Sequence, residues 1–227
     1  RRSSDLVRIW DAATGKGGLL LRGHKRAILA LAMSADGKYV ASAGLDQRLR
    51  VVDLSNKKHV ASRTSGRSCR SLAFSPDGKL LAAGGTNGEV HLWKLPGCQL
   101  QTTFRAHQYG IRAIEFSDAG DRVYTASDDL SIRSWAVASG KLVRARLGHT
   151  SLVSGLGRRT GSAELISCDM EGNVATWAAA GEKPNTLARV CKTALRTLAL
   201  QADGSFAAVG GSDNAVYLIK APFKRQE

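Results

Sequence analysis

Residues 106–137 read AHQYGIRAIEFSDAGDRVYTASDDLSIRSWAV, and this stretch contains the unit from which the whole chain is built. It begins with His107 and continues through an apolar run, a turn with Gly120 and a second apolar run. A turn with Asp129 then leads to a third run that contains Trp135. Each run is short and is bounded by Gly, Asp or Ser, as is typical of β-strands joined by tight turns. The stretch therefore predicts three antiparallel strands.

The same pattern recurs along the chain with a nearly constant period. The residues that mark the ends of the third strands are Trp10, Val52, Trp93, Trp135, Trp177 and Ile219. Successive members of this series are 42, 41, 42, 42 and 42 residues apart. The residues 28 positions before the last five are His24, Ser65, His107, His149 and Cys191. A turn lies 15 positions before the same residues, at Gly37, Gly78, Gly120, Ser162 and Gly204. Together with a weaker fourth strand in each period, this spacing indicates a repeat architecture.

The length and composition fit a single repeat domain over residues 1–227. A chain with 43% apolar residues can bury a large core, and all-β domains of this length are often undivided. The 33 basic residues exceed the 19 acidic residues and give a net charge of +14, which attracts anionic partners. A solvated basic surface, or a biased genome composition, explains the same charge.

Cysteine spacing and targeting signals exclude several function classes. The four cysteines are far apart, with no CxxC pair and no Cys/His cluster at metal-ligand spacing, so we predict free thiols and neither a metal site nor a cofactor. No apolar run approaches the ~20 residues that a membrane span needs, and no apolar signal segment follows Arg1. We therefore expect a protein of the cytoplasm or the nucleus that has no membrane segment.

Several motifs recur in phase with this period. The first residues of the repeats include Gly23-His24, Ala106-His107 and Gly148-His149, and the segments 75–78 and 9–11 read SPDG and IWD. Six residues before the end of the third strand stand Asp46, Asn87, Asp129, Glu171 and Asp213. With these motifs the chain resembles the WD40 repeat proteins over essentially its full length.

The resemblance implies an all-β fold, a WD40-type β-propeller of four-stranded antiparallel blades. The chain would supply about five blades plus a partial one, with approximate bounds 1–22 (partial), 23–63, 64–104, 105–146, 147–188 and 189–221 (lacking an outer strand). Because such propellers more often close with seven blades, we expect a fragment of a seven-bladed propeller. A gapped or self-completed ring is the alternative.

In that family a His, a Ser or Thr, the turn Asp and the Trp form a hydrogen-bonded network inside a blade. Carried over by position, the predicted structural network residues are His107, Ser127, Asp129 and Trp135, then His24 and Asp46, and finally His149, Glu171 and Trp177. His, Ser and Asp also cooperate in nucleophilic catalysis. The same positions recur as scaffold in other blades, however, and the indole would occupy the hydroxyl. We therefore predict that the protein is not an enzyme.

The family's partner-contacting positions lie three and five residues after the His position and one residue before the turn Asp. Three of the five residues at the fifth position are arginines. The resemblance thus implies a partner-binding set on the face where the first strands begin, comprising Arg70, Arg112, Arg196, Leu29, Asp128 and Met170, with Tyr109, Arg26 and Arg67 at its border.

An arginine cluster of this kind suits carboxylates and phosphates, because the guanidinium group binds planar oxyanions through two hydrogen bonds. The sequence therefore predicts a non-catalytic scaffold that binds protein partners of a multi-subunit complex through an acidic or phosphorylated segment. The alternative function is a component of an RNA-protein particle of the ribosome-assembly type, although an aromatic content of 6% disfavours recognition by base stacking. A purely structural alternative is that the arginines are solvated or pair with Asp128 and Asp129.

Overall fold

The structure of the protein is a computed structural model that describes residues 5–201 and 203–220. These residues form β-strands and connecting turns, and they include no helix long and apolar enough to cross a membrane. The predicted blade bounds at residues 1 and 221, and the predicted lack of an outer strand after the last blade, fall on positions outside the described residues.

The strands form six antiparallel sheets, in each of which the strands pair in chain order. The first sheet has two strands, β1 (Val7–Trp10) and β2 (Gly17–Leu21). The four-stranded sheets are β3 (Ile28–Met33), β4 (Tyr39–Gly44), β5 (Arg48–Asp53), β6 (Lys58–Thr64); β7 (Cys69–Phe74), β8 (Leu80–Gly85), β9 (Glu89–Lys94), β10 (Gln99–Arg105); β11 (Ile111–Phe116), β12 (Arg122–Ser127), β13 (Ser131–Ala136), β14 (Leu142–Leu147); and β15 (Val153–Arg158), β16 (Leu165–Asp169), β17 (Asn173–Trp177), β18 (Thr186–Arg189). The last sheet has three strands, β19 (Leu195–Leu200), β20 (Phe206–Gly211) and β21 (Val216–Lys220).

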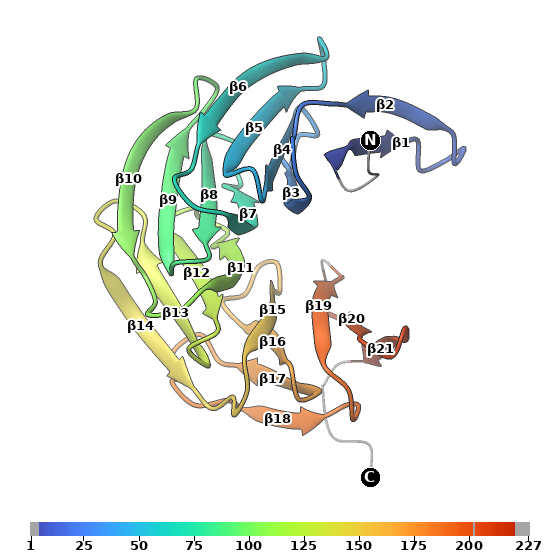
Figure 1. Cartoon of the computed structure of the whole chain (residues 1–227). Coiled ribbons are helices and arrows are strands. Elements are labelled where there is room, and N and C mark those ends of the chain that lie inside the picture. The colour runs from blue at the N-terminus through green and yellow to red at the C-terminus, as the bar shows by residue number, and fades with distance from the viewer. Residues whose placement is uncertain (1–4, 202, 221–227) are drawn as a thin grey trace.

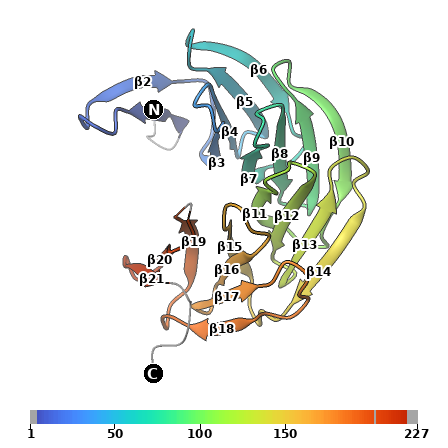
Figure 2. The same ribbon diagram turned by 180° about the vertical axis from the view of Figure 1, so that it is seen from behind.

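The sheets follow one another around an open ring (Figure 1). The first strand of each sheet from β3 onward lies innermost and packs on its counterpart in the next sheet, β3 on β7, β7 on β11, β11 on β15 and β15 on β19. The view from behind shows the β1–β2 sheet at one end of the series and the β19–β21 sheet at the other (Figure 2). This arrangement confirms the predicted propeller of four-stranded blades.

Glycines with positive φ form the turns between first and second strands, because a residue without Cβ adopts this conformation without strain. Gly120 in the β11–β12 turn has a φ of 70°. In the β15–β16 turn the corresponding residue is Gly161, with a φ of 73°, and not Ser162, at which the 42-residue period placed the turn. The two connections have the same length, because Phe116 pairs with Val123 and Arg158 pairs with Leu165. Ser162 keeps the turn hydrogen bond of Gly120, since its backbone N–H donates to the carbonyl oxygen of Arg159, but the positive φ lies one residue earlier, where the chain has a glycine.

The core consists of four apolar clusters, each shared by two neighbouring sheets. Trp135 of β13, for example, belongs to one cluster with Val90 and Leu92 of the preceding sheet. Burial of such side chains stabilises a fold by roughly 1.5–3 kcal/mol each. Each blade therefore depends for its core on a neighbouring blade.

The two end sheets, and the strand β3 next to the first of them, expose apolar residues at positions where other blades bury theirs. Trp10 is 57% exposed, whereas Trp93, Trp135 and Trp177 at the equivalent positions are 5%, 6% and 0% exposed. Leu31 and Met33 on β3, and Val216 and Leu218 on β21, are also among the exposed apolar side chains. The second strand of a preceding blade packs over the equivalents of β3, as β4 does over β7 and β12 over β15. Within residues 5–201 and 203–220, the β1–β2 sheet has no such strand to cover β3.

Candidate partner-binding site

Three of the five predicted arginines, Arg70, Arg112 and Arg196, lie at a β-bulge that recurs at the start of every first strand from β3 onward. In the β11–β12 pair, Ile111 lies opposite Ser127 and Ala113 lies opposite Ala126, so that Arg112 between them has no residue opposite it. The same irregularity occurs in the other sheets and leaves five extra residues, namely Leu29, Arg70, Arg112, Ser154 and Arg196. A bulge changes the direction of its side chain relative to a regular strand.

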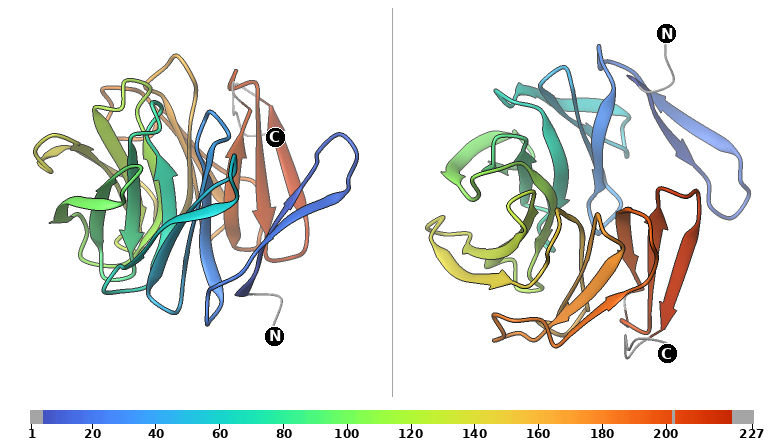
Figure 3. Two further views of the ribbon diagram at one scale, coloured as in Figure 1. Left: turned by 90° about the horizontal axis from the view of Figure 1, so that it is seen from above. Right: turned by 60° about the horizontal axis from the view of Figure 1, so that its bottom comes forward.

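We use the term lead-in face for the end of the blades that carries the loops before the first strands, at residues 22–27, 65–68, 106–110, 148–152 and 190–194. The bulges lie next to these loops, because each bulge residue is the second residue of its first strand. The side view in Figure 3 shows the blades standing next to one another, with their connecting loops at opposite ends. The bulge side chains therefore belong to the lead-in face.

Two of the predicted arginines converge on one carboxylate. The Nε–H of Arg112 donates a hydrogen bond to Oδ1 of Asp128, and Nη1 of Arg70 lies 3.9 Å from Oδ2 of the same residue. The backbone N–H of Asp128 donates to the carbonyl oxygen of Gly110 at 3.0 Å. This cluster joins the β7–β10 blade to the β11–β14 blade, and for Arg70 and Arg112 it matches the structural alternative of pairing with Asp128.

In the described part of the chain, the side chains of the remaining predicted residues form no hydrogen bond or ion pair with this cluster. Arg196, Arg26 and Arg67 are exposed and have no ion-pair partner among residues 5–201 and 203–220. The apolar residues Leu29 and Tyr109 are exposed, and Met170 is partly buried. The structure thus brings together Arg70, Arg112 and Asp128, and it leaves the others as separate positions.

The hydrogen-bonded network of the β11–β14 blade contains a hydroxyl other than the predicted one. His107 is bonded through Nδ1 to Oδ2 of Asp129 at 2.8 Å and through Nε2 to Oγ1 of Thr125 at 2.6 Å. The indole N–H of Trp135 donates to the same Oγ1 at 2.9 Å. The prediction of Ser127 in this role was wrong, because its hydroxyl donates to the carbonyl oxygen of Gly110 at 2.9 Å.

Electrostatics in this network favour an ionised carboxylate. Burial alone would raise the pKa of Asp129, but hydrogen bonds with His107 and from Ser131 hold it well below its usual value. Burial lowers the pKa of His107 although Asp129 opposes that shift. In this network the largely buried carboxylate of Asp129 is thus the acceptor, and His107 and Ser131 are among its hydrogen-bond partners.

Two other blades contain related networks. His24 is bonded to Asp46 at 2.9 Å and to Ser42 at 2.8 Å, with Val52 in place of the tryptophan. In the β15–β18 blade His149 is bonded to Oδ2 of Asp169 at 2.7 Å and to Oγ of Ser167 at 2.6 Å. The indole N–H of Trp177 donates to Ser167 at 2.8 Å.

Asp169 therefore replaces Glu171, and the prediction of Glu171 as the partner of His149 was wrong. The carboxylate of Glu171 accepts a hydrogen bond from the hydroxyl of Thr150 at 3.0 Å, on the surface. Asp169 is fully buried at the end of β16, two residues earlier, where its shorter side chain reaches the imidazole.

The β7–β10 blade lacks this network. Ala83 stands where Thr125 stands in the following blade, so the buried indole N–H of Trp93 has no acceptor within the described part of the chain. Ser65, at the His position, donates to the carbonyl oxygens of Gln47 and Arg67. In the networks that do form, the hydroxyls of Thr125 and Ser167 are fully buried, so no substrate reaches them as nucleophiles.

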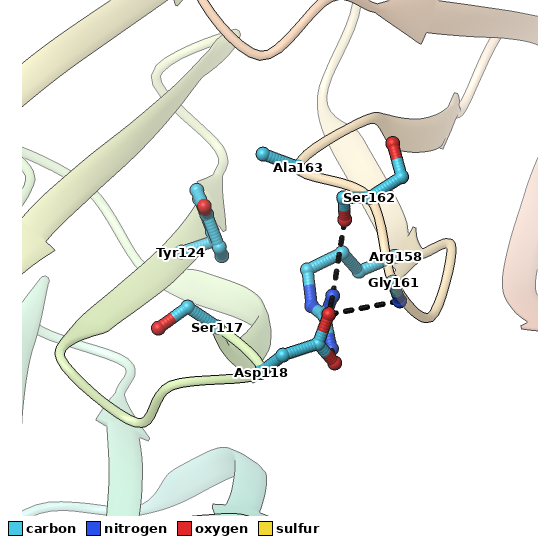
Figure 4. Close-up of a pocket in the computed structure, with 7 residues that line it drawn as sticks. All are labelled: Ser117, Asp118, Tyr124, Arg158, Gly161, Ser162 and Ala163. Atoms are coloured by element: carbon cyan, nitrogen blue, oxygen red, sulfur yellow. Dashed lines mark hydrogen bonds and ion pairs between the residues drawn. The ribbon is translucent and has the colours of Figure 1, made fainter.

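A second candidate, which the sequence did not indicate, is a cavity of about 240 Å³ between the β11–β14 and β15–β18 blades (Figure 4). Arg158 borders it and donates through Nη1 to Asp118 at 2.6 Å and through Nε to the carbonyl oxygen of Phe116 at 3.0 Å. Asp118 also accepts from the backbone N–H of Gly161 at 2.9 Å. These bonds cross from one blade to the next, so this polar cluster fastens two blades together at the end opposite the lead-in face.

Two family models match the chain. Residues 98–136 match the model described as WD domain, G-beta repeat, and residues 2–94 match the model described as Cytochrome D1 heme domain. In the second segment, His24 and His59 do not fit a haem. His24 is bonded at both ring nitrogens, and the cavity that it shares with His59 has about 10 Å³, which is room for one water at most. Across the described residues no three side chains of His, Cys, Asp or Glu are placed to hold a metal ion.

Several curated relatives share the repeat. Periodic tryptophan protein 2 of Arabidopsis thaliana is 25% identical over 174 residues, which is 75% of this chain and 19% of that protein. An F-box/WD-40 repeat-containing protein of the same plant is 28% identical over 215 residues, or 88% of this chain and 38% of that protein. An uncharacterised WD repeat-containing protein of Synechocystis is 33% identical over 137 residues, which is 59% of this chain and 39% of that protein. The chain thus spans between about a fifth and two fifths of the length of these relatives.

The solved structure of U3-55K has the same fold. It superposes with a TM-score of 0.87 at 19% identity, and the match covers 98% of this chain and 73% of that one. The in-phase motifs, the four-stranded blades and the matches to WD repeat sequences lead to one conclusion. The chain resembles the WD40 repeat proteins in its sequence and has a propeller fold of the same kind.

Proposed function

We propose that this protein is a non-catalytic scaffold whose lead-in face binds an acidic or phosphorylated segment of a protein partner within a multi-subunit complex of the cytoplasm or nucleus. The observation that supports the proposal best is the cluster of Arg70, Arg112 and Asp128, in which two guanidinium groups from neighbouring blades already share one carboxylate. Two arginines that both reach one carboxylate of the protein are also placed to bind a carboxylate or a phosphate of a partner.

The surroundings of the cluster favour a peptide ligand. Arg196 adds a third guanidinium group, which is exposed, at the same position of the last blade. Tyr109 and Leu29 offer exposed apolar surface close to the loops, and buried aromatic or aliphatic anchors contribute most of the affinity in peptide sites. The net charge of +14 increases the rate at which an acidic partner arrives.

The test replaces Arg70, Arg112 and Arg196 together by Ala and measures, by anisotropy, the binding of a fluorescent synthetic peptide that carries both glutamate and phosphoserine residues. We expect at least a tenfold loss of affinity, because each charge-assisted hydrogen bond is worth about 1.5–3 kcal/mol. The matched control replaces the exposed residues Lys94, Lys141 and Lys183, at the opposite end of the blades, by Ala. Equal binding by both triple variants and the parent would refute the proposal.

RNA is the second candidate ligand, because a net charge of +14 attracts any polyanion. Binding to phosphates releases counterions, so the affinity for a single-stranded RNA probe would fall by a power of the salt concentration with a slope of about −0.7 per contact. An RNA affinity that falls steeply with salt, together with peptide binding that the arginine variants leave unchanged, would favour this second function.

A further inference from the structure

We infer that Asp128 is a built-in competitor at the arginine pair and that it makes the site selective for phosphorylated segments over segments that carry only carboxylates. The inference rests on the proposed function of the lead-in face. It follows from the contacts of Asp128, from the charge of the cluster and from the chemistry of the two kinds of ligand.

The carboxylate of Asp128 occupies the place that an acidic ligand would take. One of its oxygens accepts from Nε of Arg112, and the other faces Nη1 of Arg70. The backbone of Asp128 is held in place, because its N–H donates to the carbonyl oxygen of Gly110 and the neighbouring Asp129 is bonded to His107, so the carboxylate stays within reach of both guanidinium groups. In the described part of the chain, neither guanidinium has another protein hydrogen-bond acceptor.

Asp128 is the one acidic residue at its position of the repeat. The equivalent residues in the other blades are uncharged, namely Leu45, Thr86, Met170 and Ser212. The β11–β14 blade therefore combines an arginine at the bulge with a carboxylate next to it, whereas the last blade presents Arg196 without one. Among the bulge positions of the described blades, the lead-in face thus has one occupied guanidinium site, at Arg70 and Arg112, and one open site, at Arg196.

A ligand carboxylate gains little at the occupied site. If it displaces Asp128, one carboxylate replaces another, and if it binds alongside Asp128, the two like charges repel each other. A phosphoryl group carries a charge of about −1.5 to −2 at pH 7 and offers three strong acceptor oxygens. It can therefore engage both guanidinium groups and outweigh the single negative charge of Asp128.

The experiment compares two synthetic fluorescent peptides of the same sequence, one with phosphoserine and one with glutamate at two positions. We expect the parent protein to prefer the phosphoserine peptide by about tenfold or more. In Asp128→Asn the affinity for the glutamate peptide should rise at least about fivefold, and the preference should shrink to about threefold, because the competing charge is gone. Asp77→Asn is the matched control, since it removes an exposed carboxylate at the opposite end of the blades.

A second pair of variants guards against effects on folding. Arg112→Ala alone leaves Asp128 to repel the ligand, so the glutamate peptide should bind more weakly to it than to the double variant R112A/D128A. Unchanged glutamate-peptide binding in Asp128→Asn, with phosphopeptide binding still lost in the triple arginine variant, would overturn the role of Asp128 and leave the proposed function intact. If the triple arginine variant bound both peptides as tightly as the parent protein does, the role of Asp128 and the proposed function would both be overturned.

Discussion

The β7–β10 and β11–β14 blades have the same strands, the same pairing order and the same bulge, yet they differ in their polar interior. In the second, Thr125 joins His107 to Trp135, whereas in the first Ala83 takes its place and the indole N–H of Trp93 is buried without a partner. The comparison teaches that apolar alternation and turn residues are sufficient to build the blade. The network supplies partners for polar groups that the blade would otherwise bury unpaired.

A second difference lies on the faces that these blades turn toward the next blade. Ala73 and Ala82 of the first blade correspond to Glu115 and Tyr124 of the second. Arg158 of the following blade stands where Phe116 stands one repeat earlier. The interface after the β11–β14 blade is therefore partly polar where the preceding one is apolar.

The largest expected effect comes from Thr125→Val. This change keeps the shape of the side chain and removes the hydroxyl, so it leaves both the Nε2 atom of His107 and the indole N–H of Trp135 buried without a partner. We expect a loss of about 3 kcal/mol in the free energy of unfolding, measured by urea denaturation. Ser127→Ala should cost about 1 kcal/mol, because Gly110 still accepts a hydrogen bond from the backbone of Asp128. If Ser127→Ala lowered the free energy of unfolding more than Thr125→Val, the hydroxyl in the network would be that of Ser127, which would contradict our assignment of Thr125.

A smaller effect, dependent on pH, is expected for Glu115→Gln. Burial raises the pKa of the Glu115 carboxyl to about 7, although Arg158 opposes the shift. A carboxyl with a raised pKa in the folded state favours folding fully below its unfolded pKa, near 4.5, and this contribution is lost as the pH rises toward 7. We expect the variant to be more stable than the parent by about 2 kcal/mol near pH 8, and equally stable near pH 4.

Glu164→Gln is the control for this pH dependence, because Glu164 is exposed and should show no such gain. Thermal unfolding of both variants across this pH range measures the difference. A gain in Glu115→Gln that stays constant with pH would show that burial of the charge is not its cause.

The smallest effect separates the two tryptophans. Trp93→Phe and Trp135→Phe remove similar volumes from equivalent positions, but only the second also removes a hydrogen bond. We expect Trp135→Phe to cost about 1 kcal/mol more than Trp93→Phe in the free energy of unfolding. Equal costs would mean that the bond from Trp135 to Thr125 contributes nothing net.

The repeat period was sufficient to predict the fold from the sequence. Turn glycines such as Gly120, and apolar residues such as Ile114 that recur at one place in each period, restrict the chain locally. Each predicts a turn or a strand without knowledge of distant contacts. The recurrence then places every strand in the same order in its blade.

The details of the networks could not be predicted in this way. Thr125 and Ser127 are two residues apart on one strand and share a face, so the alternation of side chains does not separate them. Glu171 has the predicted position in the period, but Asp169 reaches His149 from the end of β16. The pairing of Arg112 with Asp128 depends on a bulge and a turn that meet only in the folded blade.

The exposed position of Trp10 gives the protein an optical reporter. Of the four tryptophans, Trp10 alone is open to water, since Trp93, Trp135 and Trp177 are at most 6% exposed. Emission from the intact protein should therefore comprise one red-shifted component that acrylamide quenches readily and three shielded components. Any molecule that covers the β1–β2 sheet should shift the first component to shorter wavelength and protect it from the quencher, whereas a ligand on the lead-in face should leave it unchanged.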